Sequence, residues 1–190
     1  KRFVAIWTDK AVSPSGVMGA SKRMASLIVR DAARRSGRAF AVVRFGNVLG
    51  SRGSVVPYFK AQIERGGPVT ITHPEMKRFF MTTSEAVHLV LEAGGMSRAG
   101  ELFVLNMGEP VRIIDLAEDL IHLSGFTTDQ VPIISTGIRP GEKLEEALWE
   151  DDAKVDLTAH PDILLVTEPL TPVGDVRAAA KELKHAAHEG

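Results

Sequence analysis

The chain has 190 residues, of which 44% are hydrophobic and 25% charged, and its formal net charge is −1. This is an ordinary globular composition, and it excludes nucleic-acid binding through bulk positive charge. Cysteine is absent, which excludes disulfides, thiolate metal sites and cysteine nucleophiles. No apolar run approaches the roughly 18 residues that a membrane-spanning helix needs.

The first part of the chain predicts a strand, a helix and a second strand. Residues 3–7 and 39–45 are short apolar runs typical of buried parallel strands. Residues 17–35 repeat apolar side chains near the 3.6-residue period of a helix, and Gly37 is a suitable end for it. The face expected to be buried consists of Met18, Ala25, Ile28, Val29 and Ala32.

Smaller elements are predicted after residue 54. We expect helices over residues 55–64, 83–93, 113–124, 142–149 and 173–188, and strands over residues 69–72, 102–107 and 131–135. Thr82 or Thr83 is the expected N-cap of the second helix of this series. One buried face of the third helix is expected to consist of Leu116, Leu120 and Leu123. Residues 151–170 are predicted to be irregular. The alternation of strands and helices indicates an α/β fold with a second, smaller lobe.

Thr8, Asp9 and Lys10 directly follow the first strand, at the end where α/β sheets bind ligands. Met18 and Lys22 share one face of the next helix because they are four residues apart. A hydroxyl at a strand end beside such a helical lysine is the arrangement of short-chain dehydrogenases, in which the residue four before the lysine is ordinarily tyrosine. The thioether of Met18 cannot exchange a proton. Another acid and base must therefore serve the chemistry, and Asp9 and Lys10 are available.

Five ordered motifs carry a resemblance to a known family. They are TDKAVSP at residues 8–14, VMGASKR at 17–23, RFGNVLGS at 44–51, HPEMKRFFM at 73–81 and RPGEK at 139–143. In this order they resemble the bacterial polysaccharide-biosynthesis UDP-N-acetylglucosamine 4,6-dehydratases, which are extended short-chain dehydrogenases/reductases. The resemblance covers residues 3 to about 165. The form with Met18 is similar to the long members, which carry an N-terminal membrane region.

The resemblance implies a reaction without net redox change. NAD or NADP takes hydride from C4 of the sugar, water leaves across C5 and C6, and hydride returns to C6. By analogy, Thr8 binds the C4 oxygen beside the cofactor, and Lys22 holds the nicotinamide ribose. Asp9 would protonate the departing C6 hydroxyl and Lys10 would act at C5, although these two roles could be exchanged.

The resemblance also assigns substrate contacts. Asn47 matches a position that contacts the diphosphate of the substrate. Arg139 matches a phosphate ligand and Glu142 a ligand of the ribose hydroxyls, and Arg78 is a further candidate for phosphate, because a guanidinium donates two parallel hydrogen bonds. Trp7 departs from the family, which usually has a small residue before the threonine. An indole at the strand end could narrow the sugar pocket.

The organisation that the resemblance implies is the C-terminal part of a Rossmann-like parallel sheet with a smaller substrate lobe. Residues 1–54 would belong to the dinucleotide-binding domain, 55–170 to the nucleotide-sugar lobe and 171–190 to a peripheral helix. No Gly-x-Gly-x-x-Gly fingerprint occurs in the chain. We therefore expect that motif upstream, and we expect the isolated chain to bind NAD or NADP poorly and to turn over little.

The expected partner is a UDP-sugar, with no nucleic acid, no metal and no direct membrane contact in this part. The full-length protein is expected to be a homo-oligomer with this domain in the cytoplasm, anchored to the inner membrane. Two alternatives stay open. One is a related nucleotide-sugar epimerase, against which Met18 argues. The other is a catalytically inactive UDP-sugar-binding module, which Trp7 favours.

Overall fold

The computed structural model describes residues 1–51, 53–168 and 176–189, and the chain forms two compact units. Unit 1 comprises Lys1–Phe45, His88–Asn106 and Ala147–Gly190, and unit 2 comprises Gly46–Val87 and Met107–Glu146. Within the described residues, no helix is both long enough and apolar enough to cross a membrane. The two units are described in turn.

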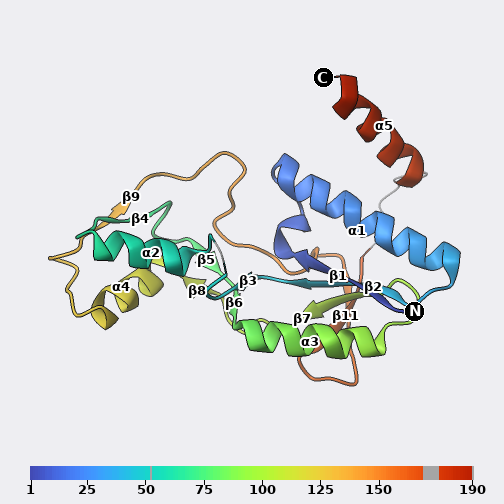
Figure 1. Ribbon diagram of the computed structural model, residues 1–190, viewed down its shortest axis with the longest axis horizontal. Helices are drawn as coiled ribbons and strands as arrows, with labels where there is room; N and C mark the ends of the chain where they lie inside the picture. Colours follow the sequence, from blue (N-terminus) through green and yellow to red (C-terminus); the bar gives the residue numbers. More distant parts are fainter. Residues whose placement is uncertain (52, 169–175, 190) are drawn as a thin grey trace. The chain divides into compact units, whose positions relative to one another are not determined.

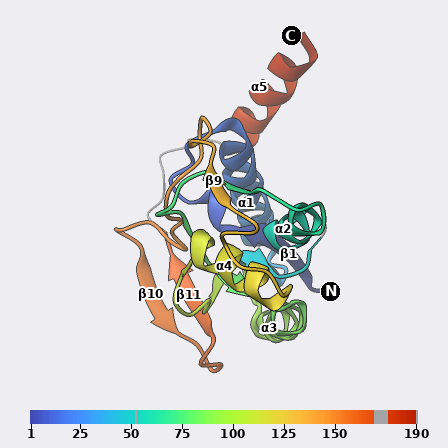
Figure 2. The ribbon, with the colours of Figure 1, turned by 90° about the vertical axis from the view of Figure 1, so that its left-hand side faces the viewer.

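Unit 1 is built on a five-stranded sheet in the order β1-β2-β7-β11-β10. Its strands are β1 (Phe3–Thr8), β2 (Phe40–Phe45), β7 (Leu102–Leu105), β10 (Lys154–Leu157) and β11 (Ile163–Thr167). The first three run parallel, whereas β11 pairs antiparallel with β7 and with β10 (Figure 2). The predicted α/β fold with a parallel-rich sheet is confirmed.

The prediction that residues 151–170 are irregular is wrong, because this segment supplies β10 and β11. Ile163 and Val166 of β11 are buried and lie in register with β7, which starts some 60 residues earlier in the chain. The only proline within the described part of the segment, Pro161, precedes β11 and so removes no donor from its ladder. Short strands that depend on such distant pairing leave little local signal.

The first strand is parallel as predicted, but the prediction that it is buried is wrong. Among the described residues β1 pairs only with β2, and Ile6 leaves 61% of its surface exposed. β2 lies between β1 and β7, and its residues from Ala41 onward are buried.

Helices cover both faces of this sheet (Figure 1). α1 (Val17–Ser36) packs on β1 and β2, and the part of α3 (Thr83–Met96) from His88 onward lies on the other face. The contacts agree with the alternation of side chains along β1: Trp7 bonds to α1, while Val4 lies against Gly94 of α3. Trp7 therefore lies on the face of the sheet that α1 covers, and Val4 lies on the face that α3 covers.

The buried face of α1 differs from the predicted one. Its buried residues are Gly19, Ser26 and Ala33, spaced by two helical turns, whereas Met18 and Ile28 are exposed. Small side chains let the helix approach the sheet and its loop closely, and a search for large apolar residues does not find such a face. Gly37 ends the helix with φ of +62°, as predicted. A further helix, α5 (Val176–Glu189), packs beside α1, and residues 173–175 of its predicted range lie outside the described residues.

Unit 2 packs two helices on short strands. The helices are α2 (Val55–Glu64), with the predicted bounds, and α4 (Ile113–Leu123). The strands form three pairs, β3 (Asn47–Val48) with β6 (Phe80–Met81), β4 (Val69–Ile71) with β9 (Ile133–Ser135), and β5 (Lys77–Arg78) with β8 (Val111–Arg112). The core includes Phe59, Ile63, Val69, Ile71, Ile113, Ala117, Leu120, Ile121 and Val131.

Two predictions for unit 2 are wrong. Leu123 is 84% exposed, because the buried stripe of α4 runs through Ala117, Leu120 and Ile121 and ends two residues before it. Residues 142–149 form an irregular, bent segment rather than a helix. The carbonyl of Leu144 accepts hydrogen bonds from the backbone of Lys77 at 2.9 Å and from the Arg78 guanidinium at 3.1 Å, so other elements take the place of a helical donor.

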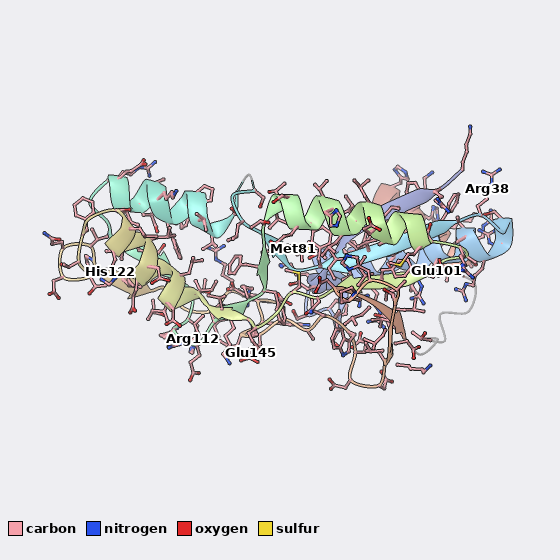
Figure 3. The ribbon with its side chains drawn as sticks, turned by 90° about the horizontal axis from the view of Figure 1, so that it is seen from below. Arg38, Met81, Glu101, Arg112, His122 and Glu145 are labelled. Atoms are coloured by element: carbon pink, nitrogen blue, oxygen red, sulfur yellow. The ribbon has the colours of Figure 1, made fainter. Side chains whose placement is uncertain are left out.

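The β5–β8 ladder carries charged side chains on the outside of unit 2. Lys77 lies opposite Arg112 in the ladder and forms an ion pair of 2.6 Å with Glu145. Arg112 and Glu145 accordingly lie near each other in Figure 3. The segment that was predicted to be helical is thus attached along the edge of this ladder.

Candidate functional site

Thr8, Asp9 and Lys10 form one hydrogen-bonded cluster at the end of β1. The Thr8 hydroxyl donates to Asp9 Oδ1 at 2.9 Å, and Lys10 Nζ donates to the same oxygen at 3.0 Å. Thr8 also caps the short 3₁₀ turn η1 (Asp9–Ala11), because its hydroxyl accepts from the Lys10 backbone N–H at 3.4 Å. The three predicted side chains are therefore brought together.

The Asp9 carboxylate is only half satisfied. The residue is 0% exposed, and its Oδ2 is buried without a hydrogen-bond partner among the described residues. A buried carboxylate oxygen of this kind is costly, since it has lost its water and gained nothing in return. Asp9 Oδ2 is therefore a buried acceptor, or a site for a proton, that no described residue fills.

Lys22 is held beside the same strand end by Trp7. The indole N–H donates to the Lys22 backbone carbonyl at 2.7 Å, and the Lys22 ammonium lies 5.4 Å from the centre of the indole ring. Met18, one helical turn earlier, is 54% exposed. The indole thus packs on α1, whereas the sequence suggested that it could narrow a sugar pocket.

Glu150 is a further residue of this neighbourhood that no motif predicted. Its carboxylate accepts from the Ser13 backbone N–H at 2.9 Å and from the Ser13 hydroxyl, and it pairs with Arg23 of α1. Burial acts to raise the pKa of Glu150, but the hydrogen bonds from Ser13 and the charge of Arg23 outweigh it and lower that pKa to about 2. The partners are 137 and 127 residues away, so no local spacing could have found them.

The predicted substrate residues lie in unit 2, and two of them, Arg78 and Arg139, contact the carboxylate of a third, Glu142. Glu142 Oε1 lies 3.6 Å from an Arg78 guanidinium nitrogen and accepts from the Thr72 hydroxyl at 3.3 Å. The Arg139 backbone N–H donates to Glu142 Oε2 at 3.3 Å, and the Arg139 side chain is exposed. Asn47 is held by the Phe79 carbonyl, to which its side-chain amide donates at 3.2 Å.

These contacts distinguish the two arginines by whether the guanidinium is already bonded within the protein. The Arg78 guanidinium donates to the Lys77 and Leu144 carbonyls and pairs with Glu142, so it is occupied in shaping the turn. The Arg139 guanidinium is presented to solvent beside it. Of the two arginines, Arg139 is the one whose fork is available for a phosphate, and its role stays a prediction.

The residues of unit 1 suit the hydroxyls of a nucleotide ribose. Lys22 is exposed and forms no ion pair with any residue that the structure describes, so its ammonium donors are available. Thr8 adds a hydroxyl at the strand end, and Trp7 keeps the lysine there. This donor set is chemically compatible with a nicotinamide nucleotide.

Comparison with known proteins decides the family. A family described as "Polysaccharide biosynthesis protein" matches residues 1–168. The chain belongs to this family. Two similar relatives are the probable polysaccharide biosynthesis protein EpsC of Bacillus subtilis (strain 168), 62% identical over 146 residues, and the capsular polysaccharide biosynthesis protein CapD of Staphylococcus aureus, 59% identical over 148 residues. Each match covers 77% of this chain but only 24% and 25% of the relatives, so the chain spans about a quarter of their length.

Solved structures confirm the Rossmann-like fold of the family. Pen from Bacillus thuringiensis matches with a TM-score of 0.79 and 35% identity, covering 90% of this chain and 54% of that one. A dTDP-glucose 4,6-dehydratase from Bacillus anthracis, solved in complex with NAD, matches with a TM-score of 0.64 over 73% of this chain and 51% of that one, at 16% identity. Among sequences, the UDP-glucose 4-epimerase of Rickettsia canadensis (strain McKiel) is 41% identical over 160 residues, which are 82% of this chain and 46% of the relative. A UDP-glucose 4-epimerase is thus among the sequence relatives of this chain, and the dTDP-glucose 4,6-dehydratase shares its fold.

Proposed function

We propose that the full-length protein is a nucleotide-sugar 4,6-dehydratase that converts UDP-N-acetylglucosamine into a UDP-linked 4-keto-6-deoxy sugar for a surface polysaccharide, such as a capsule or O-antigen. The observation that carries the proposal is the Asp9 carboxylate, buried between the Thr8 hydroxyl and the Lys10 ammonium with one oxygen unpaired. Loss of water across C5 and C6 needs an acid and a base, and this cluster supplies both.

The acid–base work is divided as follows. The Thr8 hydroxyl donates a hydrogen bond to the C4 oxygen of the sugar. A proton passes from the Lys10 ammonium to the Asp9 carboxylate along their hydrogen bond. The neutral Lys10 amine then takes the proton from C5, and the Asp9 carboxyl group gives its proton to the departing C6 hydroxyl. The two roles are exchangeable, because Asp9 and Lys10 are hydrogen-bonded and a proton can pass between them. Met18 takes no part in proton transfer, since a thioether carries no exchangeable proton.

A bound NAD or NADP supplies the hydride acceptor and donor for this chemistry. Lys22 and Thr8 are the residues of this chain that would hold its ribose, and Trp7 keeps Lys22 in place. The nucleotide of the substrate would be held in unit 2, with Arg139 and Asn47 on phosphate and Glu142 on ribose hydroxyls. Arg78 would hold Glu142 in turn.

The organisation of the whole protein is part of the same proposal. Residues 1–54 would complete a dinucleotide-binding domain whose fingerprint lies upstream, residues 55–170 would bind the nucleotide sugar, and 171–190 would be peripheral. The protein would act as a homo-oligomer at the cytoplasmic side of the inner membrane.

Product analysis on the full-length protein tests the reaction. Incubation with UDP-N-acetylglucosamine and NAD or NADP should yield a 4-keto-6-deoxy product, identified by its C6 methyl signal in NMR. A C4 epimer would instead establish the epimerase, to which the Rickettsia canadensis relative points. Binding of UDP without any product would establish the inactive binding module.

Replacement of the central carboxylate tests its role. Asp9→Asn keeps the shape of the side chain and removes its proton chemistry, so kcat should fall by about 10²- to 10⁴-fold. Asp152→Asn is the matched control, because Asp152 is an exposed carboxylate of unit 1 outside the cluster. Equal kcat values for Asp9→Asn and wild type would refute the assignment.

A further inference from the structure

Glu150 joins the C-terminal part of unit 1 to the loop that follows Lys10. Its carboxylate takes up both the backbone N–H and the hydroxyl of Ser13, and it pairs with Arg23 of α1. Its side chain is only 16% exposed. One carboxylate thus holds the loop and the following helix together from a distant part of the chain.

The backbone of Ser13 shows why the loop depends on such an anchor. Its φ is +34°, the only positive value for a residue other than glycine among the described residues. Side chains disfavour this region, and such a conformation persists only where the surroundings impose it. The two hydrogen bonds from Ser13 to Glu150 act on this residue directly.

Glu150 is itself fixed from the sheet side. Two residues earlier, the Leu148 carbonyl accepts a hydrogen bond from Arg44 Nη1 at 3.0 Å, and Arg44 is fully buried in β2. Arg44 pairs in turn with Glu168 at 2.8 Å. A continuous series of contacts therefore runs from the centre of the sheet through Leu148 and Glu150 to Ser13.

We propose that Glu150 is a positioning residue for the acid–base cluster, an assignment that rests on the function proposed above. Ser13 follows Lys10 by three residues, and the two residues between them are 0% and 1% exposed. A displacement of Ser13 would therefore be transmitted to Lys10, because the chain between them cannot move without disturbing buried side chains. Glu150 thereby keeps Asp9 and Lys10 at the distance from the substrate that proton transfer requires.

A first experiment tests the contact independently of activity. Hydrogen–deuterium exchange is measured in the full-length protein for wild type, Glu150→Gln and Asp151→Asn, the last being an adjacent exposed carboxylate. Amides around Ser13 should exchange at least about tenfold faster in Glu150→Gln, because their acceptor weakens. Asp151→Asn should match wild type. Exchange that is unchanged in Glu150→Gln overturns the proposal.

A second experiment tests the consequence for the reaction. Glu150→Gln should lower kcat by about 10- to 100-fold, because small misplacements of reacting groups are expensive. KM for UDP-N-acetylglucosamine should stay within about twofold, since the nucleotide contacts are intact. The kinetic isotope effect for substrate deuterated at C5 should increase, because proton transfer becomes slower. An effect on KM alone, or a kcat equal to that of wild type, overturns the proposal.

Two controls keep the outcomes separate. If Glu150→Gln does not fold, Ser13→Ala serves instead, because it removes the hydrogen bond from the Ser13 hydroxyl to Glu150. Ser13→Ala should lower kcat in the wild-type protein. It should lower kcat no further in a Glu150→Asp variant if the two residues act as a unit. A wild-type protein that forms no dehydrated product refutes the proposed function. In that case the exchange experiment still decides whether Glu150 holds the loop.

Discussion

Unit 1 buries charged side chains that are not fully hydrogen-bonded, which costs stability. Asp9 is buried at a strand end with one unpaired oxygen, an arrangement that a structural role alone would not favour. Arg44 is buried as completely, and its Nε likewise lacks a hydrogen-bond partner among the described residues. Each of the two buried charges has an ion-pair partner, Lys10 for Asp9 and Glu168 for Arg44.

Trp7 directly precedes Thr8, Asp9 and Lys10, and its contacts give it a testable role. Trp7→Ala removes both the indole N–H bond to the Lys22 carbonyl and the ring face beside the ammonium. Together these contacts are worth about 1–2 kcal/mol, so cofactor affinity should weaken by about 5- to 30-fold. Trp7→Phe retains a ring face and should weaken affinity only a few-fold.

Calorimetric titration of the full-length protein with NAD or NADP measures this effect. Trp149→Phe is the control, because it removes the other tryptophan of the chain and leaves Lys22 untouched. An affinity of Trp7→Ala equal to that of wild type would mean that the indole does not orient the lysine.

Among the elements, the junction of η1 with α1 places the tightest demand on one residue. A Cβ at Gly19 would lie 2.4 Å from the Lys10 carbonyl oxygen and 2.9 Å from the Pro14 Cβ. Gly19→Ala must therefore displace the loop or the helix. We expect a destabilisation of about 1–3 kcal/mol and a fall in kcat of about 10²-fold, measured by urea unfolding and by product formation.

Gly95→Ala is the matched control for this substitution. Gly95 also lies in a helix of unit 1, but a Cβ there would meet nothing within 4 Å. It should stabilise the protein by up to about 1 kcal/mol, because alanine loses less backbone entropy than glycine, and leave kcat unchanged. A Gly19→Ala variant as stable and active as Gly95→Ala would contradict the close approach.

Elements with local signals could be predicted from the sequence. The bounds of α2 agree with its apolar period, and α3 begins with the expected threonine: the Glu85 backbone N–H bonds to the Thr82 hydroxyl, and the Thr82 N–H to the Glu85 carboxylate. The strands β10 and β11 could not be predicted, because their pairing depends on which distant strand lies alongside. The same holds within the site, where Thr8 to Lys10 are neighbours in sequence but Glu150 is not.

On the scale of the whole molecule, unit 1 is assembled from three separate stretches of chain. One ion network joins the first and the third of these stretches: Glu168 lies 2.8 Å from Arg44 of β2 and 3.3 Å from Arg30 of α1. The contact with Arg44 is an ion pair rather than a hydrogen bond, since its geometry leaves Glu168 Oε1 without a bonded donor. Burial lowers the pKa of Arg30, and the charge of Glu168 opposes that shift.

This network predicts a large effect of one substitution on the stability of unit 1. Glu168→Gln leaves the Arg44 guanidinium buried without its anion, so the free energy of unfolding should fall by about 3–5 kcal/mol. Asp156→Asn breaks the Lys154–Asp156 pair, whose side chains are 73% and 41% exposed, and should cost less than about 1 kcal/mol. Urea unfolding followed by tryptophan fluorescence reports on unit 1, because Trp7 and Trp149 both lie in it. Equal urea midpoints for the two variants would show that Glu168 contributes no more to stability than a surface ion pair.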